Sequence, residues 1–358
     1  MARKLVEVDE KESARQEAMN LLNKRYGEGA IFKGEVDGLT VRSVSSGSLI
    51  VDSLLGCGGL PRGRTIEIYG KPSAGKTALA LFFIAQMQRS GGSCAFVDVE
   101  QTFNPTQAKA IGVNTDNLYL TQAFTIEQIV DTLIVLLRTK AYDMIVVDSV
   151  AAMMPLSEME AEGEKVISNK IAGRAQILGK VFTRLNAELA NSPDTIIIFI
   201  NHAKDMIGVW SPSGKPPTTT PGGSGLKFLA SIRFEVFRGA LIKKGNDIVG
   251  NVLRIKVVKN KVGPPERQGK IELYYMSGVD MISDTFDAAE GLEIIKKTGN
   301  TYAFKETKLG LGREGAKDTL RSSPDIVELI RRDVGECLAT GAGLGTGAAT
   351  EDDSEGVE

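Results

Sequence analysis

Short apolar runs alternate with helical segments along most of the chain. Residues 144–147 are entirely apolar and residues 195–200 almost so, and residues 65–69 and 94–99 are shorter runs of the same kind. Continuous apolar runs are typical of strands that are buried on both faces of a parallel sheet. The alternation of strands and helices therefore predicts an α/β core on a mainly parallel sheet.

Three further runs follow one another later in the chain with no long helix between them. They span residues 232–237, 252–259 and 270–275. This order predicts an antiparallel extension, so that the whole sheet is mixed. From about residue 282 the chain becomes a small Lys- and Gly-rich segment that ends in a helix, with Ser323 at its N-cap and Pro324 in its first turn.

The first residues carry a separate helical pattern. Residues 10–26 place apolar side chains at helical spacing among charges. One such helix cannot bury a core alone, so it must pack on the main domain or on a neighbouring chain. We expect four parts: a helix and linker at 1–37, an α/β domain at 38–281, a small α+β lobe at 282–340 and a disordered acidic tail at 341–358.

Composition narrows the class of protein. The 358 residues are 42% hydrophobic and 25% charged, as in a soluble globular protein. No apolar run reaches the roughly 18 residues that cross a membrane, and the N-terminus does not resemble a secretory signal. Three widely spaced cysteines and a single histidine, His202, argue for a reducing compartment and against a zinc site. The tail carries five acids, which either compete with nucleic acid for basic patches or keep the chain soluble.

The clearest motif is a G-x-x-x-x-G-K-T sequence between the strand at 65–69 and a helical segment at 78–87. Its residues are Gly70, Lys71, Pro72, Ser73, Ala74, Gly75, Lys76 and Thr77. In such a loop, backbone N–H groups and a helix N-terminus bind phosphates. Lys76 is expected to reach the β- and γ-phosphates of ATP, and Thr77 to ligate Mg²⁺. An incidental Gly-rich turn would not explain the strand and the helix beside it.

Two acids complete the expected nucleotide site. Asp148 follows the strand at 144–147, where its carboxylate would orient Mg²⁺ or a water bound to it. Glu100 follows the strand at 94–99, at the sheet edge where ligands of open α/β folds bind. This position makes Glu100 the candidate for activating water in hydrolysis, with an ordinary loop carboxylate as the alternative.

Two later segments are candidates for binding anions. Residues 203–225 form a long loop after a core strand, which is uncommon unless the loop is functional. Hydroxyls, glycine N–H groups, lysines and a Trp suit the backbone and bases of nucleic acid. The candidates in this loop are Lys204, Ile207, Gly208, Trp210, Thr218, Thr219, Gly222 and Gly223. Lys259 and Lys261 share one face of a strand end, where they either bind an anion or are simply solvated.

These motifs together resemble the bacterial RecA recombinase family over about residues 10–340. Besides the phosphate-binding loop, the segments that carry the resemblance are 46–52, 58–64, 147–152, 199–201, 218–223, 257–261 and 352–357. The resemblance implies a cytoplasmic DNA-dependent ATPase that uses ATP and Mg²⁺. It would form helical filaments on single-stranded DNA and exchange strands with homologous double-stranded DNA. It also implies roles in DNA repair and the SOS response, with repressor and loader proteins as further partners.

The resemblance assigns roles to individual residues. Glu100 matches the family's catalytic glutamate, and Lys259 with Lys261 matches the pair that reaches a neighbouring protomer's phosphates. Phe228 matches an interface residue that links nucleotide state to filament state. Arg174 matches a basic residue of the first DNA-binding loop, and residues 203–225 cover the second. The N-terminal helix would pack on the adjacent protomer, and the lobe at 282–340 would gather duplex DNA.

The chain departs from the family pattern near the nucleotide. The departures are Lys71, Pro72 and Ala74 in the loop, Asn104 and Gln107 where an Asp and a Tyr usually contact adenine, and His202 where a Gln usually senses the γ-phosphate. The second DNA loop is also longer around Trp210. These differences indicate a divergent paralogue or a mobile-element version of the family. They also keep a second hypothesis open: a DNA-binding filament or regulator that uses ATP as a switch but exchanges strands weakly. The N-terminal helix and the segment around Lys259 argue against a third hypothesis, a hexameric motor such as a helicase.

His202 also suggests a pH effect. An imidazole donates to a phosphate as an amide does, but its charge titrates near about pH 6.5. Protonation beside the γ-phosphate should favour the ATP-bound state. DNA-stimulated turnover or DNA affinity should then change between about pH 6 and 7.5 more than in a His202→Gln variant. A silent neutral substitution is the alternative.

Overall fold

The computed structural model describes residues 2–27, 31, 41–160, 170–206 and 218–340. The chain divides into two compact units, Met1–Arg42 and Ser43–Glu358. The expected acidic tail, residues 341–358, lies outside the described residues. So do three of the expected DNA contacts, Ile207, Gly208 and Trp210.

The first unit is built on helix α1 (Ala2–Tyr26). The helix begins well before residue 10, where the sequence pattern placed its start. No Gly or Pro interrupts residues 2–26, so nothing in this segment stops the helix from extending. Arg15 pairs with Glu12 one turn earlier, at 3.1 Å.

The second unit is built on a nine-stranded sheet with the strand order β13-β12-β11-β10-β3-β7-β6-β4-β5. In that order the strands are Gly278–Val279, Gln268–Tyr274, Asp247–Asn260, Ile232–Lys244, Thr65–Gly70, Ile196–His202, Met144–Asp148, Cys94–Asp98 and Leu118–Gln122. The strands from β3 to β5 are parallel, and the pairs from β10 to β13 are antiparallel. The predicted mixed α/β sheet is therefore confirmed.

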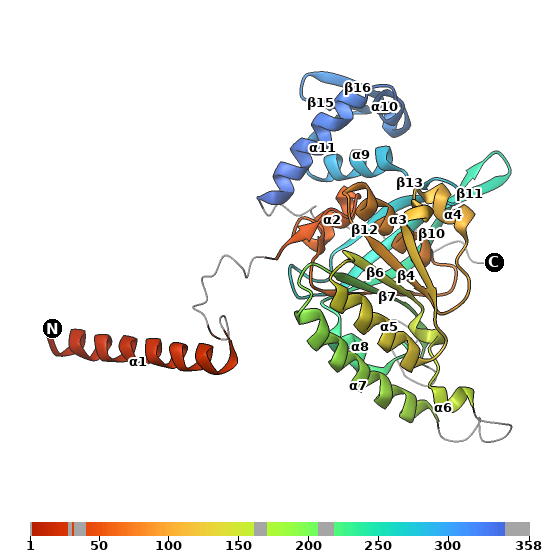
Figure 1. Ribbon diagram of the computed structural model, residues 1–358. Helices are drawn as coiled ribbons and strands as arrows, with labels where there is room; N and C mark the ends of the chain where they lie inside the picture. The colour runs from red at the N-terminus through yellow and green to blue at the C-terminus, as the bar shows by residue number, and fades with distance from the viewer. Residues whose placement is uncertain (1, 28–30, 32–40, 161–169, 207–217, 341–358) are drawn as a thin grey trace. The chain divides into compact units, whose positions relative to one another are not determined.

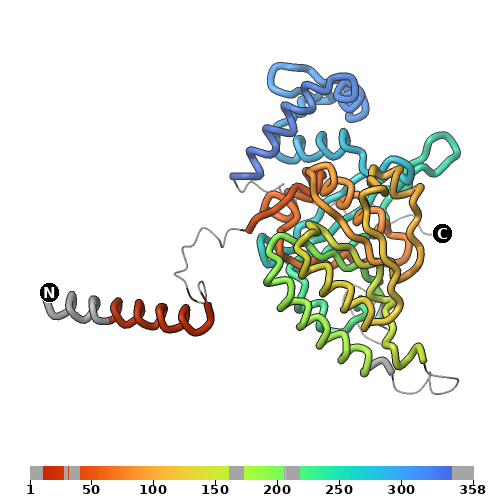
Figure 2. The backbone as a smooth tube through the Cα atoms, in the orientation of Figure 1, coloured from red at the N-terminus to blue at the C-terminus, as the bar shows by residue number. Residues whose placement is uncertain are grey.

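One detail of the sheet differs from the expectation. β10 pairs with β3 in parallel, so the antiparallel extension begins only at β11. The chain reaches β10 through helix α8 (Gly223–Leu229), and a helical crossover returns the chain in the parallel sense. The far ends of β10 and β11 continue as a hairpin that projects from the rest of the unit (Figure 2).

Helices cover both faces of the sheet. Successive side chains alternate between the faces, so that Phe96 and Val146 pack on one side and Val97 and Val147 on the other. The first face is covered by α2 (Leu49–Leu55) and α3 (Lys76–Arg89). The second is covered by α5 (Ile126–Thr139) and α7 (Lys170–Ala190), which lie side by side (Figure 1). Burial on both faces explains the continuous apolar runs of the central strands.

The C-terminal segment packs on the same core. It consists of α9 (Met281–Gly291), the three-stranded sheet β14 (Ile295–Thr298), β15 (Thr301–Phe304) and β16 (Thr307–Leu311), then α10 (Gly312–Arg321) and α11 (Pro324–Ala339). Phe286, Tyr302 and Val334 belong to the same hydrophobic cluster as α2 and α3. Asp284 on α9 accepts hydrogen bonds from the Ser48 hydroxyl and, at 2.7 Å, from the Leu49 N–H.

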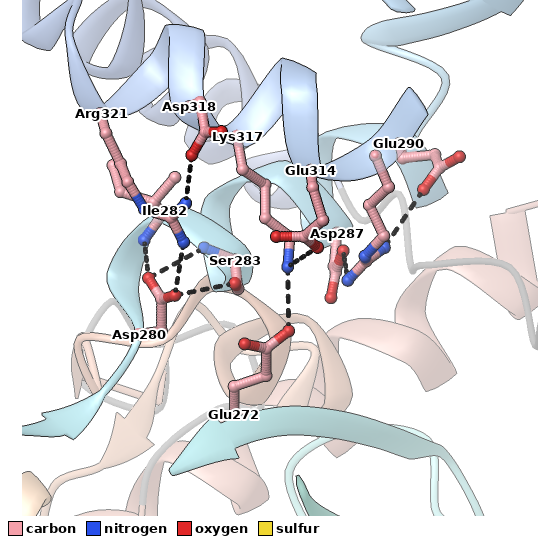
Figure 3. Close-up of polar contacts among 11 residues, drawn as sticks. Glu272, Asp280, Ile282, Ser283, Asp287, Glu290, Glu314, Lys317, Asp318 and Arg321 are labelled. Atoms are coloured by element: carbon pink, nitrogen blue, oxygen red, sulfur yellow. Dashed lines mark hydrogen bonds and ion pairs between the residues drawn. The ribbon is translucent and has the colours of Figure 1, made fainter. Parts of the chain in front are cut away.

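Ion pairs of α10 add to this attachment (Figure 3). Lys317 is buried and contacts Glu272 of β12 and Glu314, each at 3.0 Å. Arg321 contacts Asp280 at 3.3 Å and Asp318 at 2.7 Å. The pair between Lys317 and Glu272 joins α10 directly to the central sheet.

Short elements complete the described chain: β1 (Ser43–Val44), β2 (Leu60–Pro61), α4 (Pro105–Ile111), η2 (Thr115–Asn117), η3 (Val150–Ala152), α6 (Leu156–Met159), β8 (Lys204–Asp205) and β9 (Thr218–Thr219). The described residues of the loop expected at 203–225 thus include regular elements, because β8 pairs with β9 and α8 starts at Gly223. None of the helices in the described part of the chain is long and apolar enough to cross a membrane.

Candidate functional site

The phosphate-binding loop connects β3 to α3 as predicted. Two glycines are required by close contacts. A Cβ at Gly70 would lie 2.2 Å from the carbonyl oxygen of Val236, because β10 pairs directly with the end of β3. Gly75 has a φ of +93°, and a Cβ there would lie 2.9 Å from Leu253. The loop therefore presents its backbone at the N-terminus of a 14-residue helix, where phosphates bind.

Lys76 is the cation of this loop. The residue is only 5% exposed, and its Nζ donates to the carbonyl of Lys71 at 2.9 Å. Burial lowers the pKa of the Lys76 ammonium, although the charges of Asp148 and Glu100 oppose the shift. Within the described residues, no carboxylate lies within ion-pair distance of its Nζ. A buried ammonium of this kind is suited to a phosphate.

Thr77 and Asp148 meet across the site. The Thr77 hydroxyl donates to Asp148 Oδ2 at 2.7 Å. Burial raises the pKa of Asp148 to about 6, and the hydrogen bond from Thr77 offsets only part of that shift. A carboxylate and a hydroxyl are the oxygen ligands that Mg²⁺ prefers, so these two side chains suit a magnesium ion.

Glu100 lies beside these groups. The N–H groups of Val99 and Glu100 donate to the carbonyl of Asp148 at 2.7 and 3.1 Å. Oε1 of Glu100 accepts a hydrogen bond from the Ser149 hydroxyl and lies 3.0 Å from Nε2 of His202. Burial raises the pKa of Glu100, but these hydrogen bonds and the nearby charges outweigh it, so the net shift is downward. Glu100 is therefore held as a carboxylate.

One cavity of about 310 Å³ joins these residues. It is lined by Pro72, Ser73, Gly75, Lys76, Thr77, Ala78, Glu100, Gln107, Asp148, His202, Asn251, Leu273 and Tyr275. The predicted loop, catalytic glutamate and magnesium ligands thus meet in one place. Asn251, Leu273 and Tyr275 were not expected, because the sequence does not reveal that β11 and β12 fold back over the loop.

The two departures at the expected adenine contacts have different surroundings. Asn104 is the N-cap of α4, where its Oδ1 accepts from the N–H groups of Thr106 and Gln107 at 2.9 and 3.2 Å. Gln107 lines the cavity. A glutamine side chain offers hydrogen bonds rather than the ring face of a tyrosine.

Lys259 and Lys261 contact a helix end instead of the cavity. Lys259 Nζ donates to the carbonyls of Lys227 and Phe228, and Lys261 Nζ donates to the carbonyl of Phe228 at 3.2 Å. These carbonyls lie at the C-terminus of α8, which attracts cations. Burial first, and then the charges of Lys261 and Arg233, lower the pKa of Lys259. The Phe228 side chain is 74% exposed, which suits a contact with another chain.

The expected DNA contacts that the structure describes lie near the loop bases. Arg174 on α7 donates to the carbonyl of Ala151 at 3.0 Å. Lys204 pairs with Thr219 in the β8–β9 ladder, where Thr218 also lies. Gly222 and Gly223 have φ values of +93° and +66° at the start of α8, which only glycine adopts readily. The structure thus gathers Lys204, Thr218 and Thr219 at the base of the second loop.

Comparison with known proteins covers almost the whole chain. Residues 13–280 match the RecA N-terminal domain model and residues 283–339 match the RecA C-terminal domain model. The chain is 40% identical to Protein RecA of Halalkalibacterium halodurans over 349 residues, covering 97% of this chain and 98% of that protein. It is 40% identical to Protein RecA of Bacillus pumilus over 353 residues (98% and 99%) and 39% identical to that of Bacillus subtilis over 330 residues (92% and 93%).

Proposed function

This chain belongs to the RecA family, and we propose that it hydrolyses ATP on DNA and couples the hydrolysis to strand exchange. As a RecA-family recombinase it acts in DNA recombination and repair. The observation that carries the proposed mechanism is the convergence of Lys76, Asp148 and Glu100 on one cavity.

The residues present suit ATP and Mg²⁺. The backbone of the phosphate-binding loop and the buried Lys76 would hold the phosphates, and Thr77 with Asp148 would hold the metal ion. Bound Mg²⁺ would neutralise charge on the phosphate oxygens. Glu100 is ionised and lies beside the same groups, so its carboxylate can orient a water and accept its proton.

We further propose a helical filament on single-stranded DNA that pairs with homologous duplex. Lys259, Lys261 and the exposed Phe228 form a positively charged, partly apolar surface at the end of α8, which suits the phosphates of a neighbouring protomer. Arg174 and the loop that includes Lys204 and Thr219 would contact the DNA. The proposal also includes repressor cleavage, loading by accessory proteins and a cytoplasmic location. Only membership of the family supports these three points.

The contact between His202 and Glu100 favours a second candidate, a filament that switches with ATP but exchanges strands weakly. Nε2 of His202 lies 3.0 Å from Glu100 Oε1. A protonated imidazole at this distance would form an ion pair with Glu100. This pair would weaken Glu100 as the base that must accept a proton from water. Slow ATP hydrolysis would then limit strand exchange.

Strand exchange tests the proposal directly. The purified protein would be given ATP, Mg²⁺, circular single-stranded DNA and homologous linear duplex, with Lys76→Ala as the control. Joint molecules that require homology and ATP, and that the control does not form, would support the recombinase. ATP-dependent binding to single strands without exchange would support the switch-like filament.

A further inference from the structure

The side chain of Glu100 needs an anchor beyond its place near a strand end. It lies shortly after β4, lines the cavity and is 28% exposed. A glutamate has several rotatable bonds, so a partly exposed one samples many rotamers unless a neighbour holds it. A general base must stay within hydrogen-bond reach of the attacking water. The usefulness of Glu100 as a base therefore depends on the groups that hold its carboxylate.

The end of β6 supplies the backbone part of this anchor. β4 and β6 are neighbouring parallel strands, with Asp98 opposite Asp148. The carbonyl of Asp148 accepts hydrogen bonds from the N–H groups of Val99 and Glu100 at 2.7 and 3.1 Å. The backbone of Glu100 is thus held beside the end of β6, where Ser149 is the next residue.

The hydroxyl of Ser149 supplies the side-chain part of the anchor. Ser149 is fully buried and is the N-cap of η3. A serine at an N-cap usually accepts a hydrogen bond from the helix backbone, but the Ser149 side chain makes no such bond. Its hydroxyl instead donates to Oε1 of Glu100. The hydroxyl is therefore directed at the carboxylate rather than at the turn that Ser149 begins.

This contact makes the two carboxylate oxygens of Glu100 different. Oε1 accepts from Ser149 and lies 3.0 Å from Nε2 of His202. Among the residues that the structure describes, Oε2 makes no hydrogen bond or ion pair. A carboxylate that is anchored through one oxygen keeps the lone pairs of the other oxygen for a proton. Because the Ser149 hydroxyl is neutral, it also leaves the negative charge of the carboxylate in place.

Neither apolar packing nor the metal site requires this hydroxyl. Val99 and Val150 belong to a buried apolar cluster, so an alanine beside them would suit the surroundings. The carboxylate of Asp148 has its own donor, the hydroxyl of Thr77. Within the described part of the chain, the Ser149 side chain has Glu100 as its one hydrogen-bond partner. The observed contacts thus assign the hydroxyl to Glu100.

We propose that Ser149 is a positioning residue for ATP hydrolysis, which holds Oε1 of Glu100 so that Oε2 accepts the proton of the attacking water. In this step the water oxygen bonds to the γ-phosphorus and loses a proton to Oε2. The bond from the γ-phosphorus to the bridging oxygen of ADP breaks, and that oxygen keeps the electron pair. The inference rests on the proposed function, because it assumes that Glu100 is the base.

Ser149→Ala removes the hydroxyl and tests the inference. We expect the kcat of DNA-stimulated ATP hydrolysis to fall about tenfold, because a rotating Glu100 is less often in place. The Kd for ADP and the Mg²⁺ concentration at half-maximal ADP binding should each change less than about twofold, since Thr77 and Asp148 are unaltered. A loss of ADP affinity as large as the loss of kcat would show that Ser149 supports the phosphate or metal site instead.

Two further serine variants separate positioning from stability. Ser149→Thr keeps a hydroxyl at the same place and should retain at least about half of the normal kcat. Ser192→Ala removes another buried hydroxyl, which donates to the carbonyl of Leu137 at 2.7 Å and does not line the cavity. It should lower the melting temperature and leave kcat unchanged. If kcat falls together with the melting temperature in both alanine variants, a general loss of stability explains the effect and the inference is wrong.

A double variant tests whether Ser149 acts through Glu100. Glu100→Gln removes the base, so adding Ser149→Ala should slow single-turnover hydrolysis by less than about a further twofold. The same serine change should slow the protein with an intact Glu100 about tenfold. Equal losses in the two backgrounds would overturn the inference, because Ser149 would then act on another group.

The same measurements distinguish this inference from the proposed function. If Glu100→Gln hydrolyses ATP at the normal rate, Glu100 is not the base, and the proposed mechanism is wrong. If Glu100→Gln is nearly inactive while Ser149→Ala keeps the normal kcat, only the role of Ser149 is wrong.

Discussion

At the scale of single residues, the nucleotide site contains a carboxylate, Asp148, whose charged form is disfavoured by burial. The pKa of Asp148 is raised by burial to about 6, above the ordinary value of an aspartate. The native state therefore binds a proton more readily than the unfolded state, and Asp148 lowers stability as pH rises through about 6. That effect is largest at neutral pH and disappears in acid.

Asp148→Asn removes this charge and keeps an oxygen that accepts from Thr77. Without nucleotide, the variant should exceed the original protein in unfolding free energy by about 1–3 kcal/mol near neutral pH. The gain should shrink at about pH 5, and Mg²⁺-dependent nucleotide binding should be lost at both pH values. Urea unfolding and nucleotide titrations measure these effects. A gain that is the same at both pH values would contradict the assignment.

His202 allows a second prediction about pH. An imidazole changes charge in a range where the Gln of the family pattern does not. A protonated ring would bind the Glu100 carboxylate more tightly through the 3.0 Å contact and reduce its capacity as a base. DNA-stimulated turnover should fall from about pH 7.5 to 6 more steeply in this protein than in His202→Gln. Superimposable pH profiles would show that the substitution is silent.

At the scale of elements, the phosphate-binding loop depends on strand pairing that lies far away in sequence. Gly70→Ala would place a Cβ 2.2 Å from the Val236 carbonyl and force β3 and β10 apart. We expect a loss of about 3 kcal/mol or more in unfolding free energy, together with weaker nucleotide binding. Gly335→Ala is the matched control, because that helical position has open space. It should be neutral or stabilise by up to about 1 kcal/mol.

The attachment of α10 to the central sheet gives another prediction. Among the described residues, Glu272→Ala leaves the buried Lys317 ammonium with only the exposed Glu314 as an ion-pair partner. Removing one partner of a buried pair typically costs about 3–5 kcal/mol, and the exposure of Glu272 reduces this to about 2. Glu314→Ala should cost less than about 1 kcal/mol, because an exposed pair contributes little. Equal losses in the two variants, measured by urea unfolding, would show that Lys317 does not depend on Glu272.

The elements also show how far hydrophobic pattern predicts structure. The central strands were predictable because both of their faces are buried, which leaves an unbroken apolar signal. The parallel pairing of β10 with β3 was not predictable from the hydrophobic pattern, because the pairing depends on where the α8 crossover returns the chain. The β8–β9 ladder has two residues in each strand, too few to produce a period.

At the scale of the whole molecule, the sequence predicts some residues of the candidate site and leaves others unpredicted. The loop, Asp148 and Glu100 were predictable, because each follows directly from a strand end with a fixed place at the sheet edge. Tyr275 and Asn251 were not, since they reach the cavity through antiparallel strands whose register the sequence leaves open. The ring of His202 was expected near a phosphate, and its contact with Glu100 emerges only when β4 and β7 are placed in one sheet.

The proposed filament makes the complete active site a property of two chains. Lys259 and Lys261 lie at the end of α8 and do not line the cavity that holds Glu100. Lys259→Ala with Lys261→Ala should therefore leave nucleotide binding nearly unchanged and lower DNA-stimulated hydrolysis at least about tenfold.

Mixing variants tests whether the two halves come from different protomers. The double lysine variant supplies an intact Glu100, and Glu100→Gln supplies intact lysines. In a head-to-tail assembly of an equal mixture, about one site in four combines both intact halves. DNA-stimulated hydrolysis should thus recover to about a quarter of the normal rate, although each variant alone is nearly inactive. If the mixture is no more active than its parts, the lysines act within their own chain and the shared site is wrong.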